Sequence, residues 1–233
     1  MVELAKNIMK IKFNRFQWIA HIGSLIPFLL LLLDAFTNNL TVNPIQEITQ
    51  RTGRSAIIWL LLSLSCTPIN IILGLKPFLQ LRRPLGLYAA FYSFLHFLTF
   101  SVLDYNLNFE LISQTIPEKP YIILGSIGFL ILFALTITST KKSMKKLGKK
   151  WNLLHKLVYP AAIILLIHNM LAQKFIDTFA IAIILITFIL LFIRLPFIRS
   201  FFIKHQPGWS SKVNQILTGR KPSVKINTSK ENL

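Results

Sequence analysis

Acidic residues are scarce in this sequence of 233 residues: Asp and Glu together number 8, against 26 Lys and Arg. Charged residues make up only 15% of the chain, whereas a soluble domain carries about 25%. Hydrophobic residues reach 53%, which excludes disorder for most of the chain and does not fit the nucleic-acid-binding proteins that a net charge of +18 would suggest. The apolar and the basic residues must therefore lie in different places. This pattern indicates a membrane protein with several spans and basic loops.

Cysteine and the common cofactor-binding motifs are also scarce. Cys66 is the single cysteine, so no disulfide can form within the chain, and there is no C-x-x-C-H motif for covalent attachment of a cofactor. There is no glycine-rich phosphate loop and no internal repeat. Because Cys66 falls within a long apolar run, we expect it to be a small buried apolar residue.

Six long apolar runs are present, each close to the roughly 20 residues that cross a bilayer as a helix. Their lack of alternation argues against strands. The first run is too long for a removed signal peptide, and no small-residue cleavage site follows it. We therefore predict an all-α integral membrane protein, a bundle of six transmembrane helices with a tight hairpin around Gln173 and Lys174. The predicted spans are residues 16–36, 55–75, 85–103, 121–140, 153–172 and 175–193.

Lys and Arg are distributed unequally between the two sets of loops. Only four of the 26 lie in the first, third and fifth loops: Arg51, Arg54, Lys119 and Lys174. Since loops rich in Lys and Arg remain in the cytoplasm, both termini are predicted to be cytoplasmic, and anionic lipid would attract the lysine run at 141–150. The predicted organisation is a basic N-terminus (1–15), a membrane domain (16–195) and a basic, partly disordered tail (196–233).

Four of the five histidines lie within or at the edge of the predicted spans: His21, His96, His155 and His168. An ionisable residue in a membrane is costly, and a lone histidine there is explained by an interhelical hydrogen bond. A set of four also fits axial ligation of haem iron. His96 lies seven residues before the outer end of its span and His168 four, a difference of about 5 Å along a helix. We therefore expect His96 and His168 to bind one iron from opposite faces in the outer half of the membrane.

The sequence indicates the cofactor ligands in the inner half of the membrane less clearly. His155 lies about 20 Å inward from His168 but about 220° around an ideal helix, an offset that a kink at Pro160 would partly correct. His21 has the right depth to be its partner, and a non-histidine group such as a flavin or quinone is the alternative. Arg82 and Arg83, at the cytoplasmic mouth of the third span, suit either haem propionates and flavin phosphate or a plain positive-inside anchor.

Several stretches of the sequence resemble one protein family in order along residues 16–195. They are NPIQEITQRTGRSAIIWLLLSLSCTPI (43–69), RRPLGLYAAFYSFLHFLTF (82–100), TSTKKSMKKLGKKWNLLHKLVY (138–159) and IHNM (167–170). Together they resemble the MsrQ family of the ferric-reductase-like transmembrane group. These are the haem-binding membrane subunits of the bacterial periplasmic methionine sulfoxide reductase system.

The resemblance implies an inner-membrane b-type cytochrome that is an electron-transfer subunit and not the catalytic one. It would take electrons from the quinone pool or a cytoplasmic flavin reductase and pass them to a periplasmic molybdopterin reductase, which repairs oxidised methionine. The implied cofactors are FMN and one haem b or two, with His96, His155 and His168 as haem ligands. Trp151, within the third stretch, joins His21, Arg82 and Arg83 as an expected cofactor-binding residue.

The resemblance also shows where this chain departs from the wider group. The ferric reductase and NADPH oxidase pattern has two histidines on each of two spans, and Arg82 replaces one of them here, which puts a second haem in doubt. Because only 40 residues follow position 193, we expect no direct NAD(P)H oxidation by this chain. One alternative function is a stand-alone cytochrome that reduces quinone or metal. Another is a transporter or proton relay that uses histidines, against which the scarcity of acids in the spans argues.

Overall fold

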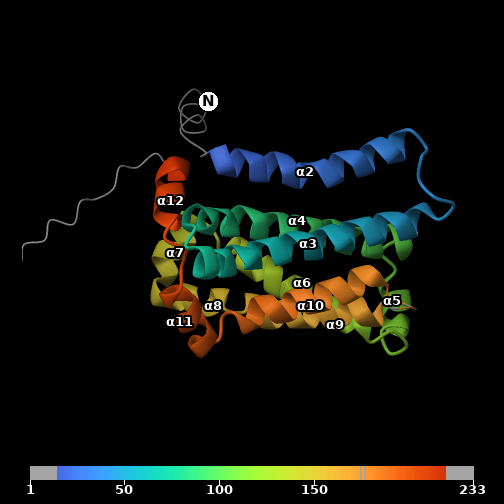
Figure 1. Cartoon of the computed structure of the whole chain (residues 1–233). Coiled ribbons are helices and arrows are strands. Elements are labelled where there is room, and N and C mark those ends of the chain that lie inside the picture. Colours follow the sequence, from blue (N-terminus) through green and yellow to red (C-terminus); the bar gives the residue numbers. More distant parts are fainter. Residues whose placement is uncertain (1–14, 174, 176, 219–233) are drawn as a thin grey trace, which may run out of the picture.

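The computed structural model describes residues 15–173, 175 and 177–218, and its elements are helical (Figure 1). Four helical segments are long and apolar enough to cross a membrane, and two bent helix pairs bring the total to as many as six spans. The predicted six-helix membrane fold is confirmed. The spanning segments are α2 (Arg15–Phe36), α3 (Pro44–Leu73), α4 (Arg82–Leu98) with η1 (Lys76–Leu81) and η2 (Thr99–Asp104), α6 (Tyr121–Ile137), α8 (Lys149–His155) with α9 (Val158–Leu171), and α10 (Thr178–Phe192).

Short helices lie at the ends of the bundle. They are α5 (Phe109–Thr115), α7 (Lys141–Leu147), α11 (Pro196–Lys204) and α12 (Ser210–Thr218). Helices α6 and α7 meet at a bend of 94°, and α10 and α11 at a bend of 78°. Both bends come where the apolar sequence ends, so α7 and α11 continue the chain outside the spanning part of the bundle.

Polar capping residues set several helix boundaries that differ from the predicted span limits. Helix α3 begins at Pro44, well before the predicted start at residue 55, because the Asn43 side chain accepts a hydrogen bond from the Gln46 N–H. Helix α10 begins at Thr178 and not at Phe175, because Asp177 caps it by accepting a bond from the Ala180 N–H at 2.8 Å. Hydrophobicity places the middle of each span well, but capping groups decide where the helix starts.

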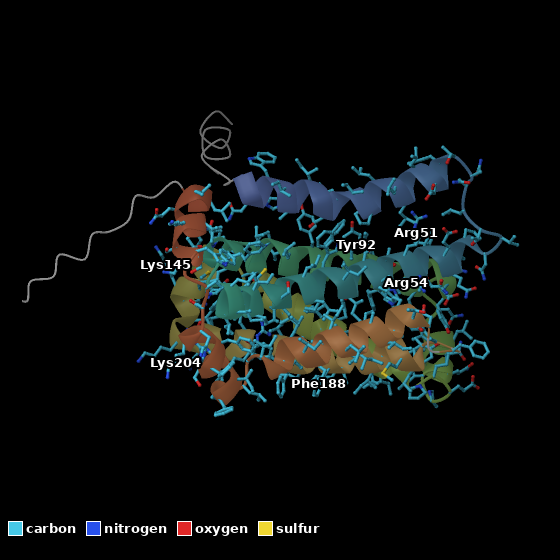
Figure 2. All side chains as sticks on the ribbon, in the orientation of Figure 1. Arg51, Arg54, Tyr92, Lys145, Phe188 and Lys204 are labelled. Carbon is cyan, nitrogen blue, oxygen red and sulfur yellow. The ribbon has the colours of Figure 1, made fainter. Side chains whose placement is uncertain are left out.

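The two ends of the bundle differ in charge (Figure 2). The basic end holds α7, α8, α11 and α12, and Lys145 and Lys204 lie there. The opposite end, here called the acidic end, holds α5, the loop at residues 37–43, the end of α9 and the start of α10, with Arg51 and Arg54 nearby. Successive spans run in opposite directions, so α4 and α9 both run from the basic end to the acidic end (Figure 1).

The core lies among α3, α4, α6, α9 and α10. Leu60 of α3, Ala89 of α4 and Ala162 of α9 are at most 3% exposed. Small residues at such positions allow helices to approach closely in a membrane. Cys66 is buried, as predicted. Large apolar side chains such as Ile19, Leu130 and Phe188 point outward, which suits contact with lipid and not with water.

Helix α2 packs against α3, α4 and η1, on the opposite side of these elements from α8 and α9 (Figure 1). Tyr92 of α4 is 1% exposed, and its hydroxyl accepts from the Phe28 N–H at 3.0 Å while donating to the Ser24 carbonyl at 2.6 Å. In a regular helix those two backbone groups would bond to each other. Pro27 lies in this turn of α2, and a proline in a helix displaces the preceding turn.

Replacing Tyr92 with phenylalanine should weaken the attachment of α2. The Phe28 N–H and the Ser24 carbonyl would each lose a partner inside an apolar bundle, a cost of about 1–3 kcal/mol in the free energy of unfolding. The measurement is denaturation of the purified protein in detergent. Tyr88→Phe is the control, because the Tyr88 hydroxyl meets the His21 side chain and not the backbone of α2. If Tyr92→Phe were as stable as the wild type, the tethering role of Tyr92 would be contradicted.

Part of the segment predicted as a basic, partly disordered tail is helical. Helices α11 and α12 lie at the basic end, and Gln206 between them donates from Nε2 to the carbonyls of Asn70 and Ile71. Asn214 of α12 donates to the Gly74 carbonyl at 2.8 Å and accepts from the Lys76 N–H at 3.0 Å. These bonds satisfy backbone groups where α3 ends. Residues 219–233, and residues 1–14 of the basic N-terminus, lie outside the described residues.

Candidate functional site

His96 of α4 and His168 of α9 lie side by side near the acidic end of the bundle. Their ring centroids are 6.1 Å apart and the ring planes make an angle of 82°. The predicted common depth of these two histidines is therefore confirmed. It arises because α4 and α9 run in the same direction and both histidines come in the last turns of their helices.

Each of the two imidazoles is held by a backbone carbonyl of a neighbouring helix. His96 Nδ1 is 2.9 Å from the carbonyl oxygen of Thr49 on α3, and His168 Nδ1 is 2.7 Å from that of Tyr121 on α6. A carbonyl only accepts, so Nδ1 is the protonated nitrogen in both rings. Each Nε2 then carries a lone pair, which is the state in which a histidine binds a metal, with its other nitrogen oriented by a hydrogen bond.

A glycine follows each of these carbonyls by one helical turn. A Cβ atom at Gly53 would lie 3.0 Å from His96 Nδ1, and one at Gly125 would lie 2.7 Å from His168 Cε1. Glycine costs helical stability, so its use at these two positions makes room for the imidazole rings. Sequence reasoning missed this arrangement. The available signal was a glycine inside each of two apolar helices, with no turn to explain it.

Both histidines line a cavity of about 830 Å³. This volume lies within the range of about 300–1,000 Å³ that is typical of cofactor and ligand sites. The part toward the middle of the bundle is apolar and contains Ile57, Phe97, Phe129, Leu132 and Leu165. The part toward the acidic end holds most of the polar lining residues, together with the apolar Ile45, Phe100 and Phe175. The polar ones are Asn43, Gln46, Gln50, Arg54, Asp104, Lys119, Gln173 and Asp177. The cavity therefore suits a ligand that has one apolar edge and one polar edge.

The site lacks the ligands to hold a bare metal ion. Among the residues that the structure describes, no three His, Cys, Asp or Glu side chains come together in a way that could bind one. Two imidazoles with free Nε2 atoms can instead supply axial ligands to a metal that brings its own equatorial ligands, as the iron of a planar macrocycle does.

The other expected ligand, His155, lies at the basic end in a separate cluster. Its ring stacks on Trp151 with centroids 3.8 Å apart, and its Nε2 is 3.4 Å from Ser139 Oγ. Trp151 Nε1 donates to the Thr138 carbonyl at 2.9 Å, and Arg83 donates to the Ser139 carbonyl. The structure thus brings together three of the residues expected to bind a cofactor at this end.

The helix that carries His155 is interrupted, as the proline in it predicts. Helix α8 ends at His155 and α9 begins at Val158. The Lys156 carbonyl accepts from the Tyr159 N–H, because Pro160 has no N–H to donate to it.

The structure does not bring His21 and His155 together. His21 Nδ1 is 3.0 Å from the Tyr88 hydroxyl of α4, while His155 faces α6 on the other side of the bundle (Figure 1). The sequence predicts similar depths for the two histidines, but α2 packs outside α3 and α4 and cannot reach α8. Arg82 is exposed; its carbonyl accepts from Ser63 Oγ at 2.7 Å. His205, the fifth histidine, is exposed in the tail.

Comparisons with known proteins identify the family of this chain. The family described as "Ferric reductase like transmembrane component" matches residues 52–166, which include His96 and His155. The protein-methionine-sulfoxide reductase heme-binding subunit MsrQ of Deinococcus radiodurans is 41% identical over 149 residues, 63% of this chain and 73% of the relative.

Two further relatives carry the same name. That of Brucella anthropi is 36% identical, covering 67% of this chain and 71% of the relative. That of Enterobacter sp. strain 638 is 33% identical over 170 residues, covering 71% of this chain and 85% of the relative. The resemblance seen in the sequence is confirmed, and the chain belongs to the MsrQ family of ferric-reductase-like multi-pass membrane proteins.

Proposed function

We propose that this chain is a b-type cytochrome subunit that binds haem between His96 and His168 and passes electrons across the bacterial inner membrane. The electrons would reach a catalytic methionine sulfoxide reductase subunit on the outer side. The observation that carries the proposal is the pair of imidazoles in one cavity, 6.1 Å apart and each oriented by a backbone carbonyl. Relatives named as heme-binding subunits of protein-methionine-sulfoxide reductase support it.

The residues present fit a haem with two histidine ligands. A metal bound by Nε2 of two rings at about 2 Å each would separate the ring centroids by about 6 Å. The separation of 6.1 Å agrees with this value. The cavity, with its apolar and polar parts, matches a macrocycle that is apolar except for the edge that carries two carboxylates. When bound there, the haem would supply a one-electron carrier.

The residues of the chain would hold and tune this carrier. The Thr49 and Tyr121 carbonyls fix the orientation of the two rings and raise the basicity of each Nε2. The apolar wall made by Phe129, Leu132 and Leu165 keeps water away from the ring system, which affects the reduction potential.

The charge of the two ends indicates how the chain is oriented in the membrane. We take the basic end as cytoplasmic, so the cavity at the acidic end lies close to the outer surface. Reduction of a methionine sulfoxide to methionine and water takes two electrons and two protons. The chain would therefore have to deliver two electrons to the partner subunit for each sulfoxide.

The cluster at the basic end would receive electrons from the cytoplasmic side. Arg83, Trp151 and His155 lie together there, where a quinone or a cytoplasmic flavin reductase would deliver electrons. An FMN at this place rests on the sequence resemblance alone and stays a prediction. A second haem on His155 would need an axial partner other than His21, which lies against α4.

The test is the absorbance spectrum of the purified protein from haem-replete cells, before and after dithionite. We expect haem bands that shift on reduction and one or two irons per polypeptide. The reduced protein should be reoxidised by the catalytic subunit in the presence of methionine sulfoxide. A colourless protein would contradict haem binding. Reoxidation by a ferric chelate but not by the partner would favour a stand-alone metal-reducing cytochrome.

A further inference from the structure

The positive residues at the acidic end are few, and two of them face the cavity. Of the four Lys and Arg that the sequence assigns to this side of the membrane, Arg54 and Lys119 line the cavity. Arg51 does not: it pairs with Asp34 of α2 at 2.6 Å and with Glu47 at 3.2 Å. Lys174 lies outside the described residues. Since positive residues in outer loops weaken the orientation signal of a membrane protein, their presence around a cavity calls for another reason.

Arg54 and Arg51 lie one turn apart on α3, and their side chains lie on different sides of this helix (Figure 2). Arg54 Nη2 is 2.9 Å from Asp177 Oδ2, in an ion pair whose side chains are 49% and 41% exposed. Such an exposed pair contributes little to stability. The Arg54 guanidinium also lies over the Phe179 ring, 5.1 Å from its centroid. The aromatic ring and the carboxylate orient a guanidinium that has further N–H donors to offer.

Lys119 and Asn169 add two more donors to the polar part of the cavity. Lys119, just before α6, lines it together with Tyr105, and the nearby Tyr105 phenol raises the pKa of Lys119, which keeps the amine charged. Asn169 follows His168, and its Oδ1 accepts from Gln173 Nε2 at 3.3 Å. Its Nδ2 is buried and has no hydrogen-bond partner among the described residues. A buried amide donor without a partner indicates a missing acceptor.

We propose that Arg54 and Lys119 bind the two carboxylates of the haem at the mouth of the cavity, with Asn169 as a further donor. This inference rests on the proposed haem between His96 and His168. It orients the macrocycle, with the carboxylate edge toward the outer surface and the apolar edge toward the middle of the bundle. Arginine and lysine are the usual partners of carboxylates, and a charge-assisted hydrogen bond is roughly twice as strong as a neutral one.

This assignment differs from one of the roles that the sequence left open for Arg82 and Arg83, the binding of haem propionates. Arg82 and Arg83 are the first residues of α4, which begins at the basic end. His96 and His168 come in the last turns of α4 and α9, at the other end of the bundle, where Arg54 lies. Arg83 is bound to the Ser139 carbonyl beside His155. The two arginines at the mouth of α4 therefore cannot serve the cavity that holds His96 and His168.

The test compares haem b with its dimethyl ester, in which both carboxylates are blocked. The full-length protein, produced without haem in detergent, is titrated with each compound and the affinity is read from absorbance. The wild type should bind haem b at least about tenfold more tightly than the diester. Arg54→Gln should bind haem b about tenfold more weakly and the diester as the wild type does. Lys119→Gln should behave in the same way.

Two control variants separate carboxylate binding from a structural role. Arg51→Gln has lost an outer arginine of the same helix that does not line the cavity, and should keep the full preference for haem b. Asp177→Asn removes the ion pair of Arg54 and should also keep it. If Arg54 only held the loop before α10, Asp177→Asn would be as harmful as Arg54→Gln, and both compounds would bind more weakly.

The outcomes also distinguish this inference from the proposed function. If the wild type binds haem b and the diester equally well, the carboxylate assignment is wrong and the haem site stands. If it binds neither, the proposed haem site itself is wrong. As a second measure, the reduction potential of the haem should be lower in Arg54→Gln, because a nearby positive charge stabilises the reduced form.

Discussion

Alanine in place of His168 is expected to abolish haem binding at the cavity near the acidic end, and His96→Ala should do the same. Each change removes one of two axial ligands. Mutation of a residue that merely orients a metal ligand costs about 10–100-fold in affinity, so loss of the ligand itself should cost about 100-fold or more. Haem content per polypeptide and the dithionite difference spectrum measure the effect.

His205→Ala provides the matched control, because His205 is exposed in the tail and bonds to the Phe201 carbonyl of its own helix. It should keep the haem content and the reduction potential of the wild type. His155→Ala should leave the bands of the outer haem in place, since His155 lies at the opposite end of the bundle. Full haem content and an unchanged potential in both His96→Ala and His168→Ala would show that the axial ligands are misassigned.

Gly125→Ala is expected to lower haem affinity by about 10–100-fold without loss of fold stability. The added Cβ would lie 2.7 Å from His168 Cε1 and 2.8 Å from Nδ1, so the ring must move and its bond to the Tyr121 carbonyl must break. Alanine in a helix is usually more stable than glycine by about 0.5–1 kcal/mol. A drop in haem affinity with unchanged or higher thermal stability of the haem-free protein would therefore be a steric effect on the ligand.

Two other glycines make the steric prediction a graded series. Gly53→Ala should have a smaller effect than Gly125→Ala, since the new Cβ would lie 3.0 Å from His96 Nδ1, where a small shift relieves the contact. Gly23→Ala should have none, because nothing lies within 4 Å of a Cβ at that position. Haem titration of the three haem-free variants would check this order. If Gly125→Ala bound haem like Gly23→Ala, the glycine would not be needed to seat His168.

For the candidate site, the sequence was sufficient to predict the depth of its two histidines in the membrane. Loop charges oriented the spans relative to one another, and counting from the span ends placed His96 and His168 at one level. Depth is a one-dimensional property that hydrophobicity and helical rise encode directly. The structure agrees because α4 and α9 run in the same direction.

Depth alone was not sufficient to predict whether the two histidines toward the basic end, His21 and His155, lie together. Counting along the spans predicts similar depths for His21 and His155, yet α2 packs outside α3 and α4, and His21 meets Tyr88. The lateral order of helices in a membrane depends on which small and polar residues face one another. A sequence read span by span does not contain that information.

The sequence by itself determined the membrane class, the helical spans, the segregation of charge between the two ends and the shared depth of His96 and His168. Only the tertiary structure showed the carbonyls of Thr49 and Tyr121 as imidazole anchors, the two glycines that make room for the rings and the position of Arg54 at the mouth of the cavity. The physical reason is that hydrophobicity and charge determine only how deep each residue lies along the membrane normal, and this depth can be read from the order of residues in the sequence. Contacts between side chains and the backbone of other helices depend on how the helices are rotated and packed.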